Sequence, residues 1–128
     1  MKKTKYKNPI PRLRNKADKN FQIIGMKKHK HCLVCGMSAD CLHHFITKGA
    51  CASLRYDDDN GIPICTECHC KHHLGQDPTI SITIREKMGD EWYARINEKK
   101  LVKIKTNVSY YRSIIKDLEE QLIILENQ

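Results

Sequence analysis

Residues 32–73 read CLVCGMSADCLHHFITKGACASLRYDDDNGIPICTECHCKHH and contain all seven cysteines of the chain. Two C-x2-C pairs, Cys32/Cys35 and Cys65/Cys68, stand near its ends with 29 residues between them. A C-x2-C turn brings two thiolates to one ion, and two such turns complete the tetrahedral ligand set of a structural zinc ion. The spacing therefore predicts a zinc site made of these four cysteines.

Zinc would be the main organiser of this stretch, because few large hydrophobic residues lie between the two pairs. A structural zinc ion supplies roughly 10–16 kcal/mol in small modules. Gly36 suits the turn that follows the first pair. We interpret Cys41, Cys51 and Cys70 as small buried thiols, with Cys41 or Cys70 as an alternative ligand.

The overall composition favours a nucleic-acid partner. The chain has 128 residues, enough for one compact domain with extensions. It carries 23 Lys and Arg against 15 Asp and Glu, a formal net charge of +8. Such a charge favours a polyanion. Aromatic residues make up only 6%, which argues against a platform for stacked single-stranded bases.

The sequence has no apolar run of the roughly 18–20 residues that a membrane span needs, and no secretory signal. We therefore expect a cytoplasmic protein without a membrane partner. In that compartment an odd number of cysteines is better explained by metal than by disulfides.

Composition divides the chain into three zones. Residues 1–31 hold eleven Lys or Arg and one acid, Asp18. We expect a mostly extended basic arm there, ordered only around Phe21–Ile24, and either contacting DNA or solvated and disordered. Residues 32–79 form the predicted zinc-bound core, with a short strand at Ile62–Ile64 and a helix after Cys68 that ends near Gly75 and Pro78.

Residues 80–128 are predicted to be a helical extension. Gly89 and Asp90 separate one short helix from another that begins near Glu91. Apolar residues then recur in steps of three and four, which is typical of a heptad-like seam: Leu101, Ile104, Val108, Tyr111, Ile115, Leu118, Leu122 and Leu125. This seam fits a helix packed on the body of the monomer, or a homodimer through the C-terminal helix.

The histidines predict a second metal site. His69 and His73 are four residues apart, so on a helix they share one face and can hold one ion. His43 could supply a third ligand from a strand packed against that helix. His44 would point the opposite way along the strand, where a neutral imidazole can act as a general base.

A histidine base needs a partner on its second ring nitrogen, and Asn60 is the candidate. Asn60 precedes Gly61, so it could equally be an ordinary turn residue. The acidic run 57–59 is interpreted as a hydrated turn, or as the source of one aspartate that braces a ligand histidine.

The order of these motifs resembles the HNH endonuclease family, whose fold is two short strands and a helix around a metal. This resemblance covers residues 32–75. Residues 54–60 and the following C-x2-C pair look like the phage recombination nucleases of the NinG/Rap type, a weaker resemblance that extends through 89–93. The expected fold is a small α+β protein with a zinc-stapled ββα-metal core, a basic N-terminal arm and a helical C-terminal extension.

The resemblance implies a role for each matching residue. His43 and His69 would be metal ligands with His73 as the third, or His72 if the helix register slips. His44 would be the general base, oriented by Asn60. NinG-type proteins usually have Asn where His69 stands, so the site is nearer to the all-histidine, bacteriocin-like variant. Imidazole ligands favour transition metals over magnesium, so the identity of the catalytic ion stays open among Mg²⁺, Mn²⁺, Ni²⁺ and Zn²⁺.

The activity implied by the resemblance is hydrolysis of DNA phosphodiester bonds, with branched recombination intermediates such as Holliday junctions as substrates in a phage or mobile element. Lys48 and Arg55 are candidate phosphate contacts, or else solvated surface charges. Two other classes of protein remain open: a non-catalytic zinc module that binds nucleic acid, and an interaction protein whose long C-terminal helix is the working part.

Overall fold

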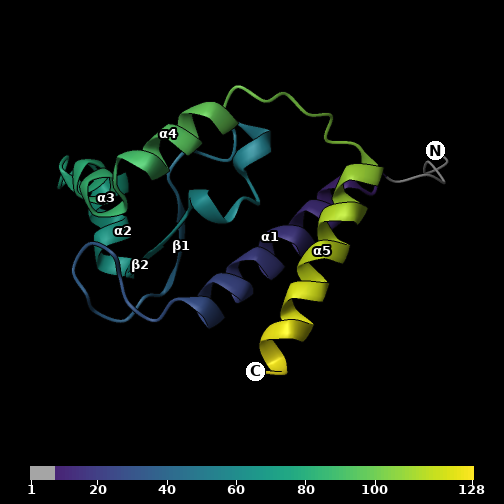
Figure 1. Cartoon of the computed structure of the whole chain (residues 1–128), viewed down its shortest axis with the longest axis horizontal. Coiled ribbons are helices and arrows are strands. Elements are labelled where there is room, and N and C mark those ends of the chain that lie inside the picture. The colour runs from purple at the N-terminus through teal and green to yellow at the C-terminus, as the bar shows by residue number, and fades with distance from the viewer. Residues whose placement is uncertain (1–7) are drawn as a thin grey trace, which may run out of the picture.

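The computed structural model describes residues 8–128, and these form a small α+β fold, as predicted (Figure 1). No helix in this range has the length and apolar character needed to cross a membrane. The elements follow one another as helix α1 (Ile10–Lys28), strand β1 (Cys41–His44), 3-10 turns η1 (Ala52–Leu54) and η2 (Asp58–Asn60), strand β2 (Gly61–Ile64), and helices α2 (Thr66–His73), α3 (Ile80–Met88), α4 (Asp90–Lys99) and α5 (Val108–Glu126).

The two strands pair antiparallel, with His43 opposite Ile62 and Leu42 opposite Pro63. Pro63 has no N–H to donate to β1. The backbone N–H and carbonyl of Leu42 instead form hydrogen bonds on the opposite edge of β1, away from β2. There the side-chain amide of Gln22 accepts from the Leu42 N–H at 2.7 Å and donates to the Leu42 carbonyl at 3.0 Å. Helix α1 therefore covers the free edge of the sheet.

The expectation of a mostly extended basic arm is wrong for its described part. Residues 10–28 form a 19-residue helix that buries Ala17, Phe21 and Ile24. These residues recur in steps of four and three, so they form one apolar stripe. Because Lys and Arg residues are numerous on the rest of the helix, the composition of the segment does not indicate this apolar stripe. Residues 1–7 of the expected arm lie outside the described residues.

Helix α1 also passes very close to β1. A Cβ atom added at Gly25 would collide with the side chain of Leu42, so only glycine allows this approach.

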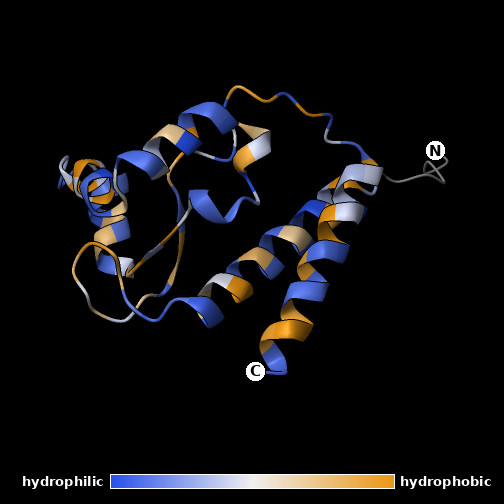
Figure 2. Ribbon diagram, viewed as in Figure 1, coloured by the Kyte–Doolittle hydropathy of each residue, from blue (hydrophilic) through white to orange (hydrophobic). Residues whose placement is uncertain are grey.

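Helices α1 and α5 lie side by side and run in the same direction (Figure 1). The apolar face of α5 is turned towards α1 (Figure 2), and its Tyr111, Ile115 and Leu118 are buried. The seam therefore packs on the body of the monomer, one of the two predicted outcomes. It begins only at Val108, because Asn107 caps the helix by accepting a hydrogen bond from the Tyr110 N–H. Leu101 and Ile104 lie in the exposed connection before it.

Helices α3 and α4 pack on the other part of the sheet, and the break between them falls at Gly89, as predicted. Their core is completed by the Trp92 side chain, whose Nε1 donates to the Asp59 carbonyl at 2.7 Å. The carboxylate of Asp59 pairs with Arg95 and Lys99. The acidic run is therefore not simply a hydrated turn, and it does not support a histidine. It anchors α4, because Arg95 and Lys99 lie one turn apart on the same face of that helix.

We predict that Leu118→Ala lowers the free energy of unfolding by about 2–5 kcal/mol, because it leaves a cavity between α5 and α1. Leu118 is only 3% exposed, whereas Ile124 on the same helix is 59% exposed. Ile124→Ala is therefore the matched control and should change stability by less than about 0.5 kcal/mol. Urea unfolding measures both. Equal losses would contradict the observed packing of α5.

Candidate metal and active site

The four cysteines predicted to bind zinc lie together, with their sulfur atoms all within 4.8 Å of one another. Cys32 and Cys35 come from the loop after α1, Cys65 is the N-cap of α2, and Cys68 lies in its first turn. Four thiolates at such distances are a suitable ligand set for a tetrahedral zinc ion. The cluster joins the loop, the end of β2 and the start of α2.

The charge state of the cluster also favours a cation. Burial alone would raise the pKa of the Cys32 thiol, but backbone hydrogen bonds, led by that of Cys35, lower this pKa to about 7. Burial and the neighbouring thiols, first that of Cys65, raise the pKa of Cys68. One thiolate therefore opposes the ionisation of the next. A divalent cation at their centre removes that conflict, because it stabilises every thiolate at once.

The other three cysteines stand outside this cluster. Cys41 is half-buried beside His69, and Cys51 is half-buried beside Ser53. Cys70 is exposed, so the expectation of a buried thiol is wrong there: it sits on the outer face of α2. Neither Cys41 nor Cys70 belongs to the group of four sulfur atoms.

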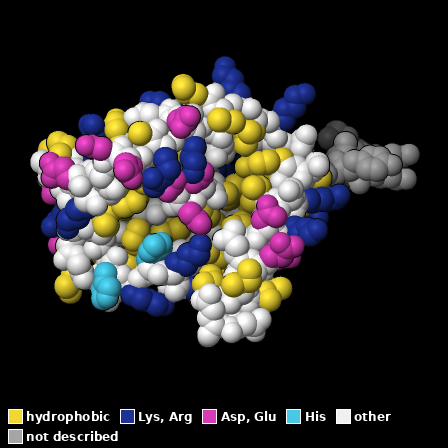
Figure 3. Space-filling model, viewed as in Figure 1, with side chains coloured by type: hydrophobic (Ala, Val, Ile, Leu, Met, Phe, Trp, Pro, Cys, Tyr) yellow, Lys and Arg dark blue, Asp and Glu magenta, His cyan; other side chains and the backbone are white. Residues whose placement is uncertain are grey.

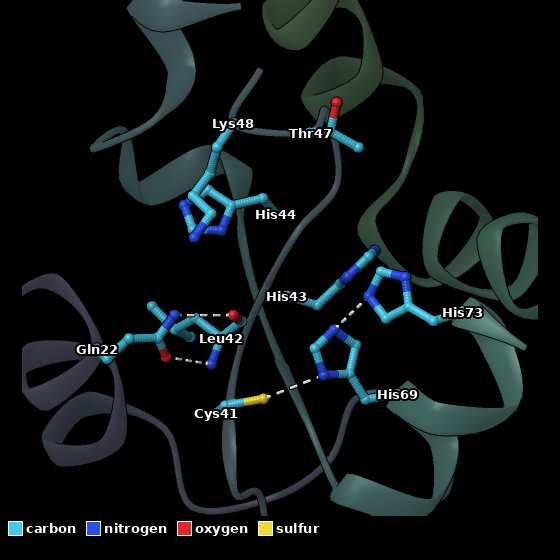
Figure 4. Close-up of a pocket in the computed structure, with 9 residues that line it drawn as sticks. All are labelled: Gln22, Cys41, Leu42, His43, His44, Thr47, Lys48, His69 and His73. Atoms are coloured by element: carbon cyan, nitrogen blue, oxygen red, sulfur yellow. Dashed lines mark hydrogen bonds between the residues drawn. The ribbon is translucent and has the colours of Figure 1, made fainter. Parts of the chain in front are cut away.

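A second cluster gathers His43, His69 and His73, each with a ring nitrogen within 4.8 Å of the others (Figure 4). His43 comes from β1, and the other two lie one turn apart on α2. The Nε2 atoms of His69 and His73 are 2.8 Å apart, and the Nδ1 of His69 faces the Cys41 sulfur at 3.5 Å. His72 packs its ring against His43, but it is His73 that completes the group.

These imidazoles are suited to hold a transition metal. Burial, with the neighbouring charge of His69, lowers the pKa of His43 to about 3. Burial and the charge of His73 likewise lower the pKa of His69. Both rings are therefore neutral at neutral pH and keep the lone pair that a metal ion needs. Three imidazole ligands are typical of zinc and related ions.

His44 lies on the opposite side of β1 from the triad, beside Lys48, as the alternation of a strand predicts (Figure 4). Its Nε2 lies 2.8 Å from the Arg55 carbonyl oxygen. A carbonyl only accepts, so Nε2 carries the hydrogen and Nδ1 keeps its lone pair. Burial lowers the pKa of His44, although the hydrogen bond to Arg55 opposes this. His44 is thus neutral and oriented at neutral pH.

Both kinds of histidine line one hollow of about 330 Å³. Its wall includes His44 and Lys48, the three clustered histidines, Gln22 and Thr47. The space-filling view shows histidine side chains at the surface next to Lys and Arg side chains (Figure 3). A phosphate group entering this hollow would meet imidazoles and a lysine together.

The predicted hydrogen bond between Asn60 and His44 is not present. Asn60 is fully buried, and its side-chain oxygen accepts a hydrogen bond from the Ile46 N–H at 2.7 Å. Its side-chain nitrogen donates to the Ile46 carbonyl at 2.9 Å and to the Leu54 carbonyl at 3.1 Å. The residues between β1 and β2 leave these backbone groups without strand partners, and Asn60 satisfies them. Asn60 thereby holds the loop that carries Arg55. The Arg55 carbonyl, and not the Asn60 side chain, is the hydrogen-bond partner of His44.

The structure also corrects the interpretation of Arg55 as a phosphate contact. Its guanidinium forms a bidentate pair with Asp18, at 2.9 and 2.6 Å, so it is used inside the protein. Asp18 is the one acid among residues 1–31, and this isolation was the signal in the sequence for an internal partner. Lys48 lies in the wall of the hollow, as a phosphate contact requires.

Comparisons of the chain with protein-family models, with curated proteins and with solved structures give no match. Its function is therefore inferred from the geometry of its own residues and from the order of motifs in residues 32–75.

We predict that Cys68→Ala abolishes binding of one zinc ion per chain and unfolds the region around α2, because it removes one of the four ligands of an ion that supplies roughly 10–16 kcal/mol in small modules. Cys70→Ala, two residues along on the same helix, is the control and should keep full zinc content. Elemental analysis and circular dichroism measure the outcome. Full zinc content in Cys68→Ala would disprove the four-cysteine site.

A second prediction separates His73 from His72. In zinc-loaded protein, His73→Ala should weaken Ni²⁺ binding at the histidine cluster by more than about tenfold, since even the loss of an outer-shell partner typically costs 10–100-fold. His72→Ala should leave the affinity within about threefold, because His43, His69 and His73 remain. Calorimetric titration measures both constants. A larger loss in His72→Ala would assign His72 as the third ligand.

Proposed function

We propose that this chain is a metal-dependent endonuclease of the HNH type, which hydrolyses DNA phosphodiester bonds with His44 as general base. The observation that carries this proposal is the meeting of two histidine environments in one hollow: a three-imidazole cluster on one side and an oriented, neutral His44 on the other. The motif order of residues 32–75 supports the same conclusion.

His44 has the chemistry of a base. Its Nδ1 accepts a proton from a water molecule as that water attacks the phosphorus, and the bond to the 3′ oxygen breaks. The 3′ oxygen takes a proton from solvent, which leaves a 5′-phosphate and a 3′-hydroxyl. The Arg55 carbonyl accepts a hydrogen bond from the Nε2–H group, and this bond stabilises the imidazolium that forms. A base of this kind typically contributes about 10²–10⁴-fold in rate.

The histidine cluster is the proposed site of the catalytic ion. His43, His69 and His73 would hold a divalent ion there, and a bound ion would supply Lewis-acid stabilisation of the charge that develops on the phosphate. Lys48 contacts a neighbouring phosphate from the wall of the hollow, and the net charge of +8 favours DNA more generally. The cysteine cluster has a structural role, because it holds α2, the helix that presents His69 and His73.

We predict that His44→Ala cuts supercoiled plasmid about 10²–10⁴-fold more slowly than the parent, while zinc content and DNA binding are retained. The assay uses Mg²⁺, Mn²⁺, Ni²⁺ and Zn²⁺ in turn, with an EDTA control. His29→Ala is the matched variant, since His29 is exposed and lies outside the hollow. Equal cutting by His44→Ala and the parent would refute the assigned base. DNA retarded but left intact by the parent protein would instead favour the non-catalytic zinc module.

The same assay on a four-way junction beside a linear duplex tests the preference for branched DNA that the resemblance implies.

A homodimer would suit paired incisions. Since the inner face of α5 packs on α1, such a dimer would use the outer face, where Ile123 and Ile124 are 58% and 59% exposed. Sedimentation of the zinc-loaded protein measures the oligomeric state.

A further inference from the structure

Helix α1 contacts the strand that carries His43 and His44 at two points, and at a third it contacts the loop that follows this strand. Gln22 pairs with the backbone of Leu42, directly before His43. The Phe21 ring packs against the His44 ring with 5.5 Å between centroids. Asp18 binds Arg55, whose carbonyl orients His44. Each contact comes from the same face of α1, so this helix forms one wall of the site rather than a separate arm.

The contact at Asp18 is the most specific of the three. Its Oδ1 accepts from Arg55 Nε at 2.9 Å and from the Tyr56 hydroxyl at 2.8 Å, while Oδ2 accepts from Arg55 Nη2 at 2.6 Å. The side chains of Asp18 and Arg55 are only 26% and 18% exposed. A bidentate, charge-assisted pair in such surroundings fixes orientation as well as distance.

Arg55 needs such a partner, because its backbone lies in the irregular stretch between β1 and β2. Asn60 fixes the neighbouring Ile46 and Leu54 from inside the loop. Asp18 fixes Arg55 itself from outside, through the side chain. The Arg55 carbonyl, 2.8 Å from His44 Nε2, is thereby held between these two supports.

We propose that Asp18 is a positioning residue for His44 and acts through Arg55. The inference rests on the proposed function, because the consequence of positioning is a rate. The hydrogen bonds of Asp18 are made with Arg55 and Tyr56, and Asp18 is outside the histidine cluster. It sets where the Arg55 carbonyl lies, and so the direction in which His44 Nδ1 points.

The expected effect is on kcat. Asp18→Asn keeps the size of the side chain but removes the charge that holds the guanidinium, so His44 loses its fixed partner. A displacement of about 1 Å at a reacting group can cost on the order of 10²-fold, and we expect kcat to fall about 10- to 100-fold. KM, zinc content and Ni²⁺ binding should stay unchanged. Asp18→Glu keeps the charge and should recover part of the rate.

A double-mutant cycle tests whether Asp18 acts through Arg55. Asp18→Asn, Arg55→Met and the double variant should have similar kcat values, because all three break the same link. Two controls account for ordinary structural effects. Glu119→Gln breaks the exposed α1–α5 ion pair with Lys16, and Ile96→Val loosens the core on α4. Both should cut at the parent rate. Losses in Asp18→Asn and Arg55→Met that multiply in the double variant would overturn the proposal.

A second readout does not depend on cutting. The hydrogen bond to Arg55 should give a slowly exchanging Nε2–H signal for His44 in the NMR spectrum of the zinc-loaded protein, assigned by its absence in His44→Ala. Asp18→Asn should lose this signal, and Glu119→Gln should keep it. If the parent cuts DNA and Asp18→Asn cuts equally fast, the role of Asp18 is refuted and the nuclease stands. If the parent cuts no DNA with any metal, the nuclease is refuted, and the Nε2–H signal still decides whether Asp18 orients His44.

Discussion

The eight-residue helix α2 is the constraint on which both candidate sites depend. It contributes to the cysteine cluster through Cys65 at its N-cap and Cys68 in its first turn, and to the histidine cluster through His69 and His73. A helix this short is unstable alone in water, and of its own residues only Cys68 is buried. A metal ion on the four thiolates would therefore stabilise the helix and, through it, the spacing of the two imidazoles.

Strand β1 divides the remaining chemistry between its two sides. Because successive side chains alternate, His43 faces α2 and the other imidazoles, whereas His44 faces Phe21 and the loop before β2. The pairing of α1 with α5 supports this second side. Tyr111 of α5 accepts a hydrogen bond from Arg14 of α1, and the two helices bury one apolar cluster around Leu42. Helices far apart in the sequence, α1 and α5, thus together support strand β1.

Sequence reasoning failed where an interaction depended on partners far apart in the chain. Helix α1 was hidden because lysines and arginines outnumber its few buried residues, and their burial becomes evident only when α5 packs against them. Arg55 looked like a free phosphate contact because its partner, Asp18, stands 37 residues away. The role expected of Asn60 belongs to a backbone carbonyl, which has no signature in a sequence. In each of these cases the contact joins separate elements and leaves no local spacing pattern in the sequence.

The sequence by itself determined the group of four cysteines and the pair His43 and His69 of the second candidate metal site. The C-x2-C spacing, the four-residue step from His69 to His73 and the adjacent pair His43-His44 are local patterns, and the geometry of a turn, a helix or a strand converts them directly into positions. Only the tertiary structure decided what orients His44, which of His72 and His73 joins the cluster, and that α1 forms a wall of the site. These outcomes depend on how separate elements pack, and packing is set by the shapes and charges of surfaces that meet only in the folded chain.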